Sequence, residues 1–276
     1  MRLLADASCS VRGILRDPNR LYPVQQEEHA ARITYVAADH LSGPELTRAF
    51  TGAKALFLCT GTSPNQISVE ETAIDAARAA GVERIVKLSA PVVASPASVE
   101  VAQWHRRIER HLAASGLEHC ALRPSAFMQN WLRNTQSIVH ARVLVGSAGD
   151  APRNYIDCRD LAVIAVRLLL TQTPLQTPAL MIAGPEAISN QTLVERLSRA
   201  IGQPIRYENL SRGDHLHMLL TRAALPEWLA RHIVELEELA IQVPEVACNT
   251  LTELLGRYPR TIDEFIQEHR SAFAPR

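Results

Sequence analysis

The chain has 276 residues, of which 47% are hydrophobic, so it can bury a sizeable core and is not predicted to be disordered. Its 29 Lys and Arg balance its 29 Asp and Glu, and this neutrality speaks against nucleic acid or an anionic membrane as a partner attracted by bulk charge. No apolar run approaches the roughly 18 residues of a membrane helix, and no signal-peptide pattern opens the chain.

The cysteines indicate the compartment. The chain has five of them, an odd number, widely spaced and mostly in apolar runs. This pattern favours reduced, buried thiols over a disulfide framework or a zinc site. The sequence therefore predicts a globular protein of the cytoplasm.

Short apolar runs in the first two thirds of the chain predict strands. They cover residues 11–15, 33–36, 55–59, 84–89, 119–123 and 179–183. The runs are nearly continuous rather than alternating, as in parallel strands covered on both faces. Between them, residues 69–80 and 100–114 have helical periodicity, and Gly81 and Gly116 follow as stops. This alternation predicts an α/β fold with a doubly wound parallel sheet of the Rossmann type.

From about residue 188 the pattern becomes mostly helical. The segment ISNQTLVERLSRAIGQP reads as a capped helix that Gly202 and Pro204 end. Further helical stretches follow around 213–223, 226–241 and 261–272. We therefore expect two domains, a dinucleotide-binding domain over residues 1–187 and a smaller helical lobe over residues 188–276. A substrate would bind in a crevice between them.

The opening of the chain lacks the usual first unit of a dinucleotide-binding sheet. In such a sheet the first strand is central, and the turn after it carries glycines that let the backbone approach the pyrophosphate. Neither G-x-x-G-x-x-G nor G-x-G-x-x-G occurs, and Gly13 lies inside the first predicted strand. Residues 3–8, LLADAS, look like the tail of a helix. Roughly 20–25 residues are missing relative to a complete unit.

Several segments together resemble one family. They are SVRGILRDP, GAKALFLCTGTSPNQ, AIDAARAAGVERIVKLSA, WHRRIERHLAASGLEHCALRPSAFMQNWL, YIDCRDLA, GPEAIS and YPRTIDEFIQEH. In this order and spacing they resemble NmrA-like proteins of the atypical short-chain dehydrogenase/reductase group over nearly the whole chain. The resemblance implies a Rossmann fold and binding of NADP(H), with NAD(H) as the other candidate.

The family normally begins with a strand and a G-A-T-G-x-x-G turn, which this sequence lacks. Either the start is misassigned, since a valine codon can be read as an initiator, or the truncation is real and the phosphate cradle is lost. The first explanation is favoured, because removing a central strand leaves buried N–H and C=O groups unpaired at about 1–3 kcal/mol each.

The resemblance also implies a cofactor site. Arg16 stands where relatives meet the 2′-phosphate of NADP, which suits a planar guanidinium, and Asp39 stands where they approach the adenine. The alternatives are a solvated arginine and a turn or capping aspartate. Thr60, Gly61 and Thr62 would border the nicotinamide ribose, although small residues are also ordinary turn chemistry.

A second set of positions would lie near the nicotinamide. Ser89 matches the strand-end serine of the family. Pro124, Ser125 and Phe127 belong to the loop RPSAFMQN, which in relatives flanks the nicotinamide and the substrate. Phe127 and its neighbour Met128 are equally well explained as core residues.

The proton donor is the open question. Short-chain dehydrogenases usually use Tyr-x-x-x-Lys, in which lysine lowers the pKa of the tyrosine, but no tyrosine here has Lys four residues later. The chain contains only Lys54 and Lys87. By resemblance, His105 occupies the place where many relatives have lysine, and it could hold the ribose or shuttle a proton. The alternative is a histidine on the helix surface.

Other chemistries lack their motifs. There is no G-x-S-x-G elbow, P-loop, H-E-x-x-H or C-x-x-C. His215 and His217 are two residues apart, which on a helix points them to different sides, so no metal site is predicted. Asp157 and Asp160 look like a strand-end turn and a helix cap.

The predicted function is an NADP(H)-preferring oxidoreductase that reduces a small carbonyl, quinone or similar acceptor. Its partner would be a small-molecule substrate, with neither nucleic acid nor a membrane involved. One alternative is a non-catalytic regulator that senses NAD(P) and reports to a protein partner. Another is a truncated chain that no longer binds a dinucleotide.

Overall fold

The computed structural model describes residues 9–17, 32–91 and 99–274, so the expected helix tail at 3–8 lies outside the described residues. The chain forms two compact units. Unit 1 comprises Met1–Ser89, Trp104–Leu122 and Ala162–Leu180, and unit 2 comprises Ala90–Gln103, Arg123–Leu161 and Met181–Arg276. The expected division at residues 187 and 188 stays a prediction. None of the helices in the described ranges is both long and apolar enough to cross a bilayer.

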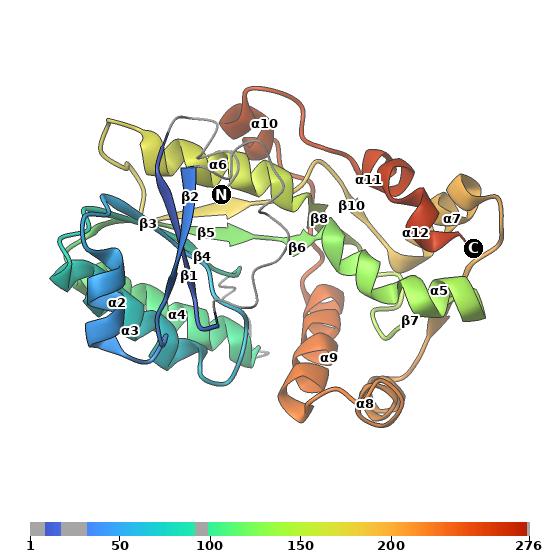
Figure 1. The fold of residues 1–276 in the computed structure, drawn as a ribbon. Helices are drawn as coiled ribbons and strands as arrows, with labels where there is room; N and C mark the ends of the chain where they lie inside the picture. The colour runs from blue at the N-terminus through green and yellow to red at the C-terminus, as the bar shows by residue number, and fades with distance from the viewer. Residues whose placement is uncertain (1–8, 18–31, 92–98, 275–276) are drawn as a thin grey trace. The chain divides into compact units, whose positions relative to one another are not determined.

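Unit 1 is built on parallel strands, as predicted (Figure 1). Strand β1 (Val11–Leu15) pairs with β2 (Ile33–Ala37). A second sheet has the order β3-β4-β5-β9, with β3 (Ala55–Leu58), β4 (Arg84–Leu88), β5 (Glu118–Pro124) and β9 (Ala179–Ile182). Pairing is parallel from β3 to β4 and from β4 to β5. Among the described strands, β1 and β3 thus belong to different sheets.

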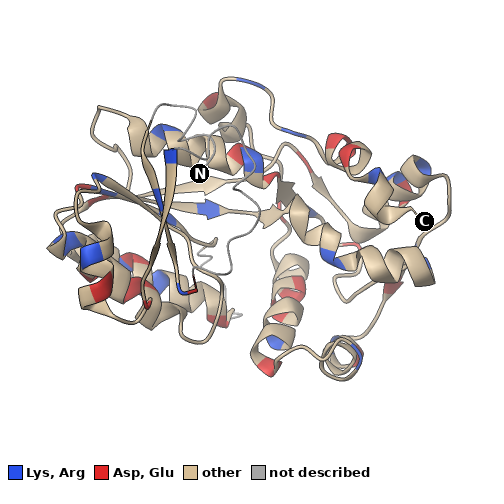
Figure 2. Ribbon diagram, viewed as in Figure 1, with Lys and Arg blue, Asp and Glu red and all other residues tan. Residues whose placement is uncertain are grey.

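Helices α2 (Gly43–Phe50), α3 (Gln66–Ala79) and α4 (Glu100–Ala114) pack on these strands in unit 1. The sequence analysis missed α2 and began α3 at residue 69, whereas α4 has the predicted bounds. Figure 2 shows that acidic and basic residues are mixed along these helices. Arg107 of α4 pairs with Glu71 of α3 at 2.9 Å. The core centres on Ile74, Ile85 and Ile108, which have no exposed surface.

Unit 2 contains short strands that the sequence did not predict. Strand β8 (Arg153–Ile156) lies between β6 (Ala126–Phe127) and β10 (Ala187–Ile188), and β7 (Val143–Gly146) pairs in parallel with β11 (Arg206–Asn209). The sequence from residue 188 onward was expected to be mostly helical, yet it supplies β10 and β11. Strands of two to four residues are too short to show an alternating pattern.

Unit 2 has its own helices and its own apolar clusters. The helices are a 3₁₀ helix, η4 (Met128–Asn134), and α5 (Thr135–Ala141), α7 (Asn190–Ile201), α8 (Arg212–Thr221), α9 (Glu227–Gln242), α10 (Thr250–Leu255), α11 (Ile262–Glu268) and α12 (Arg270–Phe273). Helix α6 (Cys158–Leu170) begins in unit 2 and continues in unit 1. Met128, Leu193 and Phe265 belong to the core of unit 2.

Gly184 has a clear packing role in the GPEAIS segment. A Cβ atom added there would lie 1.9 Å from the carbonyl oxygen of Tyr155. The buried side chain of Asn154 occupies the same region, where its Nδ2 donates to the carbonyl oxygens of Gly184, Glu186 and Val246 at 3.0 Å each. Glycine is therefore required because β8 and the GPEAIS segment approach each other closely.

Candidate functional site

The carboxyl ends of β1 and β2 bring together two of the predicted cofactor residues. The parallel register pairs Leu15 with Ala37, so Arg16 and Asp39 follow neighbouring strand ends, and both are exposed. Asp39 accepts a hydrogen bond from the backbone N–H of Leu41 at 3.0 Å, which is the turn role named as its alternative.

His40 lies beside these two residues. Its Nε2 atom is buried and meets no hydrogen-bond partner among the described residues. Burial lowers the pKa of His40, the charge of Arg16 lowers it further, and that of Asp39 opposes both. A buried, unsatisfied ring nitrogen next to an exposed guanidinium fits a site that receives a polar, anionic ligand.

The turn after β3 carries Thr60, Gly61 and Thr62. Gly61 and Thr62 are exposed, and a Cβ atom at Gly61 would meet nothing within 4 Å. Thr60 is half-buried, and its hydroxyl donates to Oε1 of Glu70 at 2.6 Å. Of the three, Thr60 is therefore held by a hydrogen bond to a buried residue of unit 1.

Behind Thr60 lies a set of polar side chains that we call the polar cluster: Thr60, Gln66, Glu70, Lys87, Ser89, His105 and Glu109. All of its members except Thr60 come in pairs. Gln66 and Glu70 are one turn apart on α3, and His105 and Glu109 are one turn apart on α4. Lys87 and Ser89 alternate along β4 and its end. Side chains at these spacings share a face of a helix or a strand, so three elements aim their polar pairs at one place.

Lys87 is the centre of the polar cluster. Its side chain is 0% exposed; its ammonium group pairs with Oε2 of Glu70, whose side chain is 1% exposed. It also donates to the carbonyl oxygen of Leu88 at 2.9 Å and faces Nδ1 of His105 at 3.2 Å. Burial lowers the pKa of Lys87, and the charges of Glu70 and Glu109 act against that shift.

Two predicted residues, His105 and Ser89, are buried members of the polar cluster. His105 is 6% exposed, so the alternative of a histidine on the helix surface is wrong. Ser89 is 5% exposed, and its hydroxyl donates to Oε1 of Glu109 at 2.5 Å. The roles of His105 in catalysis and of Ser89 in cofactor binding stay predictions.

The sequence analysis missed Lys87, Glu70 and Gln66 as members of a site. A signal existed, because Lys87 stands in the apolar run RIVKL. A lysine in a strand that is covered on both faces needs a buried partner.

In unit 2, the segment RPSAFMQN is ordered by strand pairing and is not a loop. Pro124 ends β5, Phe127 is in β6, and Met128 begins η4 and is fully buried. The backbone N–H of Ser125 donates to the carbonyl oxygen of Ile182 at 2.9 Å, and its hydroxyl donates to Asn154 at 2.7 Å. Met128 is therefore a core residue, while roles for Pro124, Ser125 and Phe127 at the cofactor stay predictions.

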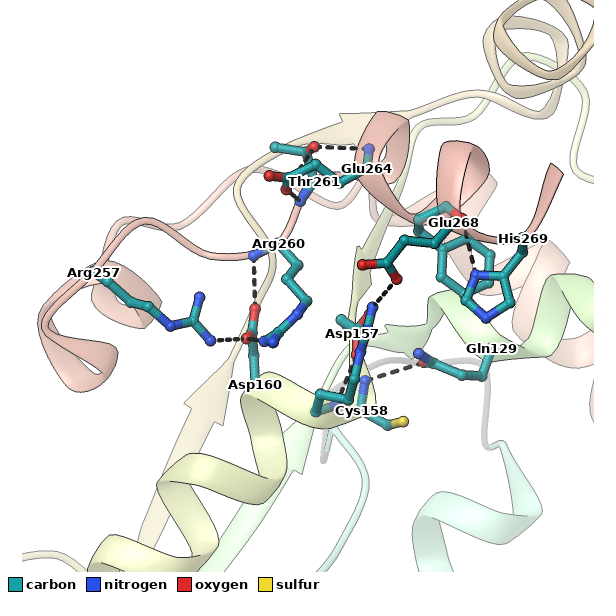
Figure 3. Close-up of polar contacts among 12 residues, drawn as sticks. Gln129, Asp157, Cys158, Asp160, Arg257, Arg260, Thr261, Glu264, Glu268 and His269 are labelled. Atoms are coloured by element: carbon teal, nitrogen blue, oxygen red, sulfur yellow. Dashed lines mark hydrogen bonds and ion pairs between the residues drawn. The ribbon is translucent and has the colours of Figure 1, made fainter. Parts of the chain in front are cut away.

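Asp157 and Asp160 hold the first turn of α6 to the C-terminal segment (Figure 3). Asp157 accepts from the backbone N–H of Arg159 at 2.8 Å, which is the bond of a helix cap. Asp160 pairs with the guanidinium groups of Arg257 and Arg260 and accepts from the backbone N–H of Arg260 at 2.7 Å. Both carboxylates are 0% exposed, so their task here is structural.

A serine, a histidine and a glutamate also meet in unit 2. Ser147 donates to Glu237 at 2.6 Å, and Nδ1 of His215 lies 3.1 Å from the hydroxyl of Ser147 and 2.9 Å from Glu237. A hydrolytic triad needs serine and carboxylate on opposite ring nitrogens, whereas here both lie at Nδ1. The group therefore ties α8 and α9 to the end of β7. Among the described residues, no three His, Cys, Asp or Glu side chains are grouped as metal ligands.

Comparison with known proteins places the chain in a class. A family model described as NAD(P)H-binding matches residues 1–172. The chain is 31% identical over 278 residues to an NAD(P)H azoreductase of Xenophilus azovorans, covering 99% of this chain and 94% of that protein. It is 33% identical over 275 residues to a (4-alkanoyl-5-oxo-2,5-dihydrofuran-3-yl)methyl phosphate reductase of Streptomyces griseus, covering 99% and 93%. The chain therefore belongs to the NAD(P)H-binding family.

Solved structures confirm the predicted fold. The NADPH-dependent quinone oxidoreductase QOR2 of Escherichia coli, complexed with NADPH, superposes with a TM-score of 0.83 at 24% identity, covering 97% of this chain and 94% of that chain. The negative transcriptional regulator NmrA, complexed with NAD, superposes with a TM-score of 0.75 at 14% identity, covering 97% and 89%. These likenesses show the fold, and it is the fold that the resemblance to NmrA-like, atypical short-chain dehydrogenases/reductases implied.

Proposed function

We propose that this protein is an NADP(H)-dependent oxidoreductase that reduces a small organic acceptor, such as a quinone, an azo compound or a carbonyl compound. Two relatives that are aligned over 99% of this chain are both named as reductases. The observation that carries the cofactor preference is the exposed guanidinium of Arg16 beside the unsatisfied Nε2 of His40.

The residues fit one end of the dinucleotide well. Arg16 would hold the 2′-phosphate, which suits a planar guanidinium, and Asp39 would lie on the adenosine side. When bound, the reduced nicotinamide supplies a hydride. The chain must orient it at the carboxyl ends of the strands, where Thr60, Gly61 and Thr62 are placed, and must provide one proton to the reduced acceptor.

The cellular setting is part of the same proposal. The described cysteines are all free thiols, at positions 9, 59, 120, 158 and 248, which suits the reducing cytoplasm. We infer a small-molecule substrate and no role for nucleic acid or a membrane.

The test of the cofactor site is a calorimetric titration of the protein with NADPH and NADH. Arg16→Ala is expected to weaken NADPH binding at least about tenfold while leaving NADH binding unchanged, because only NADPH carries the 2′-phosphate. Arg78→Ala, at another exposed arginine of unit 1, is the matched control. Equal losses for both cofactors in Arg16→Ala would contradict the assignment of Arg16.

The test of turnover is a panel of menadione, 1,4-benzoquinone and the azo dye methyl red under anaerobic conditions. NADPH oxidation with at least one of them is expected. Tight NADPH binding with no oxidation across the panel would count against an oxidoreductase and favour the regulator.

A further inference from the structure

The polar cluster is mostly buried, and only Thr60 and Glu109 among its members are half-buried. Glu70 and Lys87 are 0% exposed, and Gln66 is 2% exposed. Thr60 is half-buried, and the residue after it, Gly61, is exposed. In parallel α/β sheets ligands bind beyond the carboxyl ends of the strands, which is where Thr60 follows β3. The hydroxyl of Thr60 thus joins the interior of the cluster to the edge at which a ligand would bind.

Two described contacts of the His105 ring bear on its protonation state. A neutral imidazole has one N–H. Its Nδ1 faces the amino group of Lys87 at 3.2 Å, and its Nε2 faces Nε2 of Gln66 at 3.4 Å. The Gln66 amide nitrogen also donates to Oε1 of Glu70 at 2.9 Å, while its Oε1 is buried without a partner among the described residues.

If Lys87 is an ammonium, Nδ1 of His105 must accept a hydrogen bond from it, and Nε2 of His105 must carry the ring proton. The ring N–H of His105 then points at the amide N–H₂ group of Gln66, and two donors face each other. If Lys87 is a neutral amine, Nδ1–H donates to it and Nε2 accepts from Gln66. The amine still donates to Glu70 and to the carbonyl oxygen of Leu88, so these contacts are all satisfied. The described contacts of Lys87 and of the His105 ring therefore each pair a donor with an acceptor once the cluster has lost one proton.

We propose that Glu70, Lys87 and His105 hold a proton for the reaction and that the hydroxyl of Thr60 delivers it to the reduced acceptor. Thr60 would thus take the role that the tyrosine of a Tyr-x-x-x-Lys motif has in other short-chain dehydrogenases. The inference rests on the proposed function, since it assigns the proton that accompanies hydride transfer. Thr60 is the catalytic residue, and the three buried residues act through it.

The proton moves in a balanced sequence. Lys87 gives a proton to Glu70 and becomes a neutral amine, and His105 keeps its single ring proton in this step. The carboxyl torsion of Glu70 has two equivalent wells, so a half-turn carries the proton to the side of Thr60. Glu70 then donates to Oγ of Thr60 as the Thr60 O–H bond breaks and its proton passes to the acceptor. The acceptor thus gains a hydride and a proton, and solvent returns one proton to the cluster after product leaves.

Charged and titratable groups face the cluster from each surrounding element. They are Glu70 from α3, Lys87 from β4, His105 and Glu109 from α4, and Cys59 at the end of β3. Burial raises the pKa of Cys59, and Glu70 raises it further against the effect of Lys87. The thiol therefore stays protonated and does not compete for the exchanged proton near neutral pH.

The first test uses the ligand-free protein and needs no turnover. The ¹⁵N shifts of the His105 ring are followed by NMR between about pH 6 and pH 10. The expected result is a change from the Nε2–H to the Nδ1–H tautomer as Lys87 loses its proton, and the absence of that change in Lys87→Met. A single tautomer over the whole range in the unaltered protein would overturn the proposal.

The second test measures single-turnover oxidation of NADPH by 1,4-benzoquinone. Thr60→Val should slow it roughly 100-fold, the typical contribution of a placed proton donor. Thr60→Ser should stay near the unaltered rate because it keeps the hydroxyl, and Thr72→Val on α3 is the control for the same substitution outside the cluster. NADPH affinity is measured for each variant and the rates are compared at saturating NADPH, because Thr60 also belongs to the proposed cofactor site.

The outcomes separate the two proposals. If the unaltered protein neither binds nor oxidises NADPH, the proposed function fails. If it oxidises NADPH and Thr60→Val does so at the same rate with the same pH profile, the oxidoreductase stands and the proton path through Thr60 is wrong.

Discussion

Replacing Lys87 by methionine should destabilise unit 1 far more than its position in an apolar strand suggests. The side chains of Lys87 and Glu70 are 0% and 1% exposed, so the carboxylate would be left buried with only Thr60 and Gln66 as donors. Removing one partner of a buried ion pair typically costs about 3–5 kcal/mol, and we expect a loss of that size in the free energy of unfolding. Replacing Lys87 and Glu70 together by methionine should recover most of it, because an apolar pair of similar volume is often as stable.

The assay is urea unfolding followed by circular dichroism for Lys87→Met, Glu70→Met and the double variant. Lys54→Met is the matched control, since Lys54 is the other lysine of the chain and is exposed; it should change stability by less than about 0.5 kcal/mol. Two results would contradict the expected coupling between Lys87 and Glu70. One is a loss of stability in Lys87→Met no larger than that in Lys54→Met. The other is a double variant whose loss equals the sum of the losses in Lys87→Met and Glu70→Met.

The pH dependence of that pair has a definite sign. Burial lowers the pKa of Lys87 in the folded protein below its ordinary value, so between the two pKa values the unfolded chain binds more protons. In that alkaline window the unfolding free energy of the unaltered protein should rise with pH relative to that of Lys87→Met. A difference that falls with pH would contradict the direction of the shift.

Three further predictions concern unit 2. Gly184→Ala should lower the free energy of unfolding by about 3 kcal/mol or more, because the added Cβ would meet the backbone of Tyr155. Gly213→Ala is the control and should be tolerated, since the atom nearest to its added Cβ is 3.9 Å away. Equal melting temperatures of the two variants would refute the close approach at Gly184. Burial raises the pKa of Tyr155 to about 12, so stability should fall as pH rises from 10 to 12, and Tyr155→Phe should remove up to about 3 kcal/mol of that loss, measured by urea unfolding at each pH. Burial, with a smaller effect of Arg153, lowers the pKa of His232 to about 4, so stability should fall as pH drops from 6.5 to 4. His232→Leu should therefore unfold at a lower pH than the unaltered protein, and equal acid midpoints would contradict the burial of the ring.

Most of unit 1 could be predicted because its elements carry strong local signals. The apolar runs gave all of its strands, and α4 was predicted with its bounds because Glu100–Ala114 combines clear periodicity with a glycine stop. Helix α2 was missed since its eight residues, Gly43–Phe50, follow a turn-rich segment and have too short a pattern. The strands of unit 2 were missed for the same physical reason, as pairing with distant partners defines them.

The site was predictable where residues follow strand ends and not where burial creates the chemistry. Arg16, Asp39 and Thr60 could be placed from the order of the strands alone. The partnership of Lys87, Glu70 and His105 depends on three elements meeting in space, which no short motif records. Lys87 in its apolar strand was the one visible sign of that partnership, and it required asking where the charge would go.

The most direct test of an NADP(H)-dependent oxidoreductase is to mix the protein anaerobically with equimolar NADPH and an excess of 1,4-benzoquinone and to follow the nicotinamide absorbance. We expect NADPH to be lost and hydroquinone to form in equal amounts. The rate should exceed that without protein, and Thr60→Val should lower it. If the folded protein leaves the rate at its protein-free value with every acceptor of the panel, the protein is not an oxidoreductase of this kind.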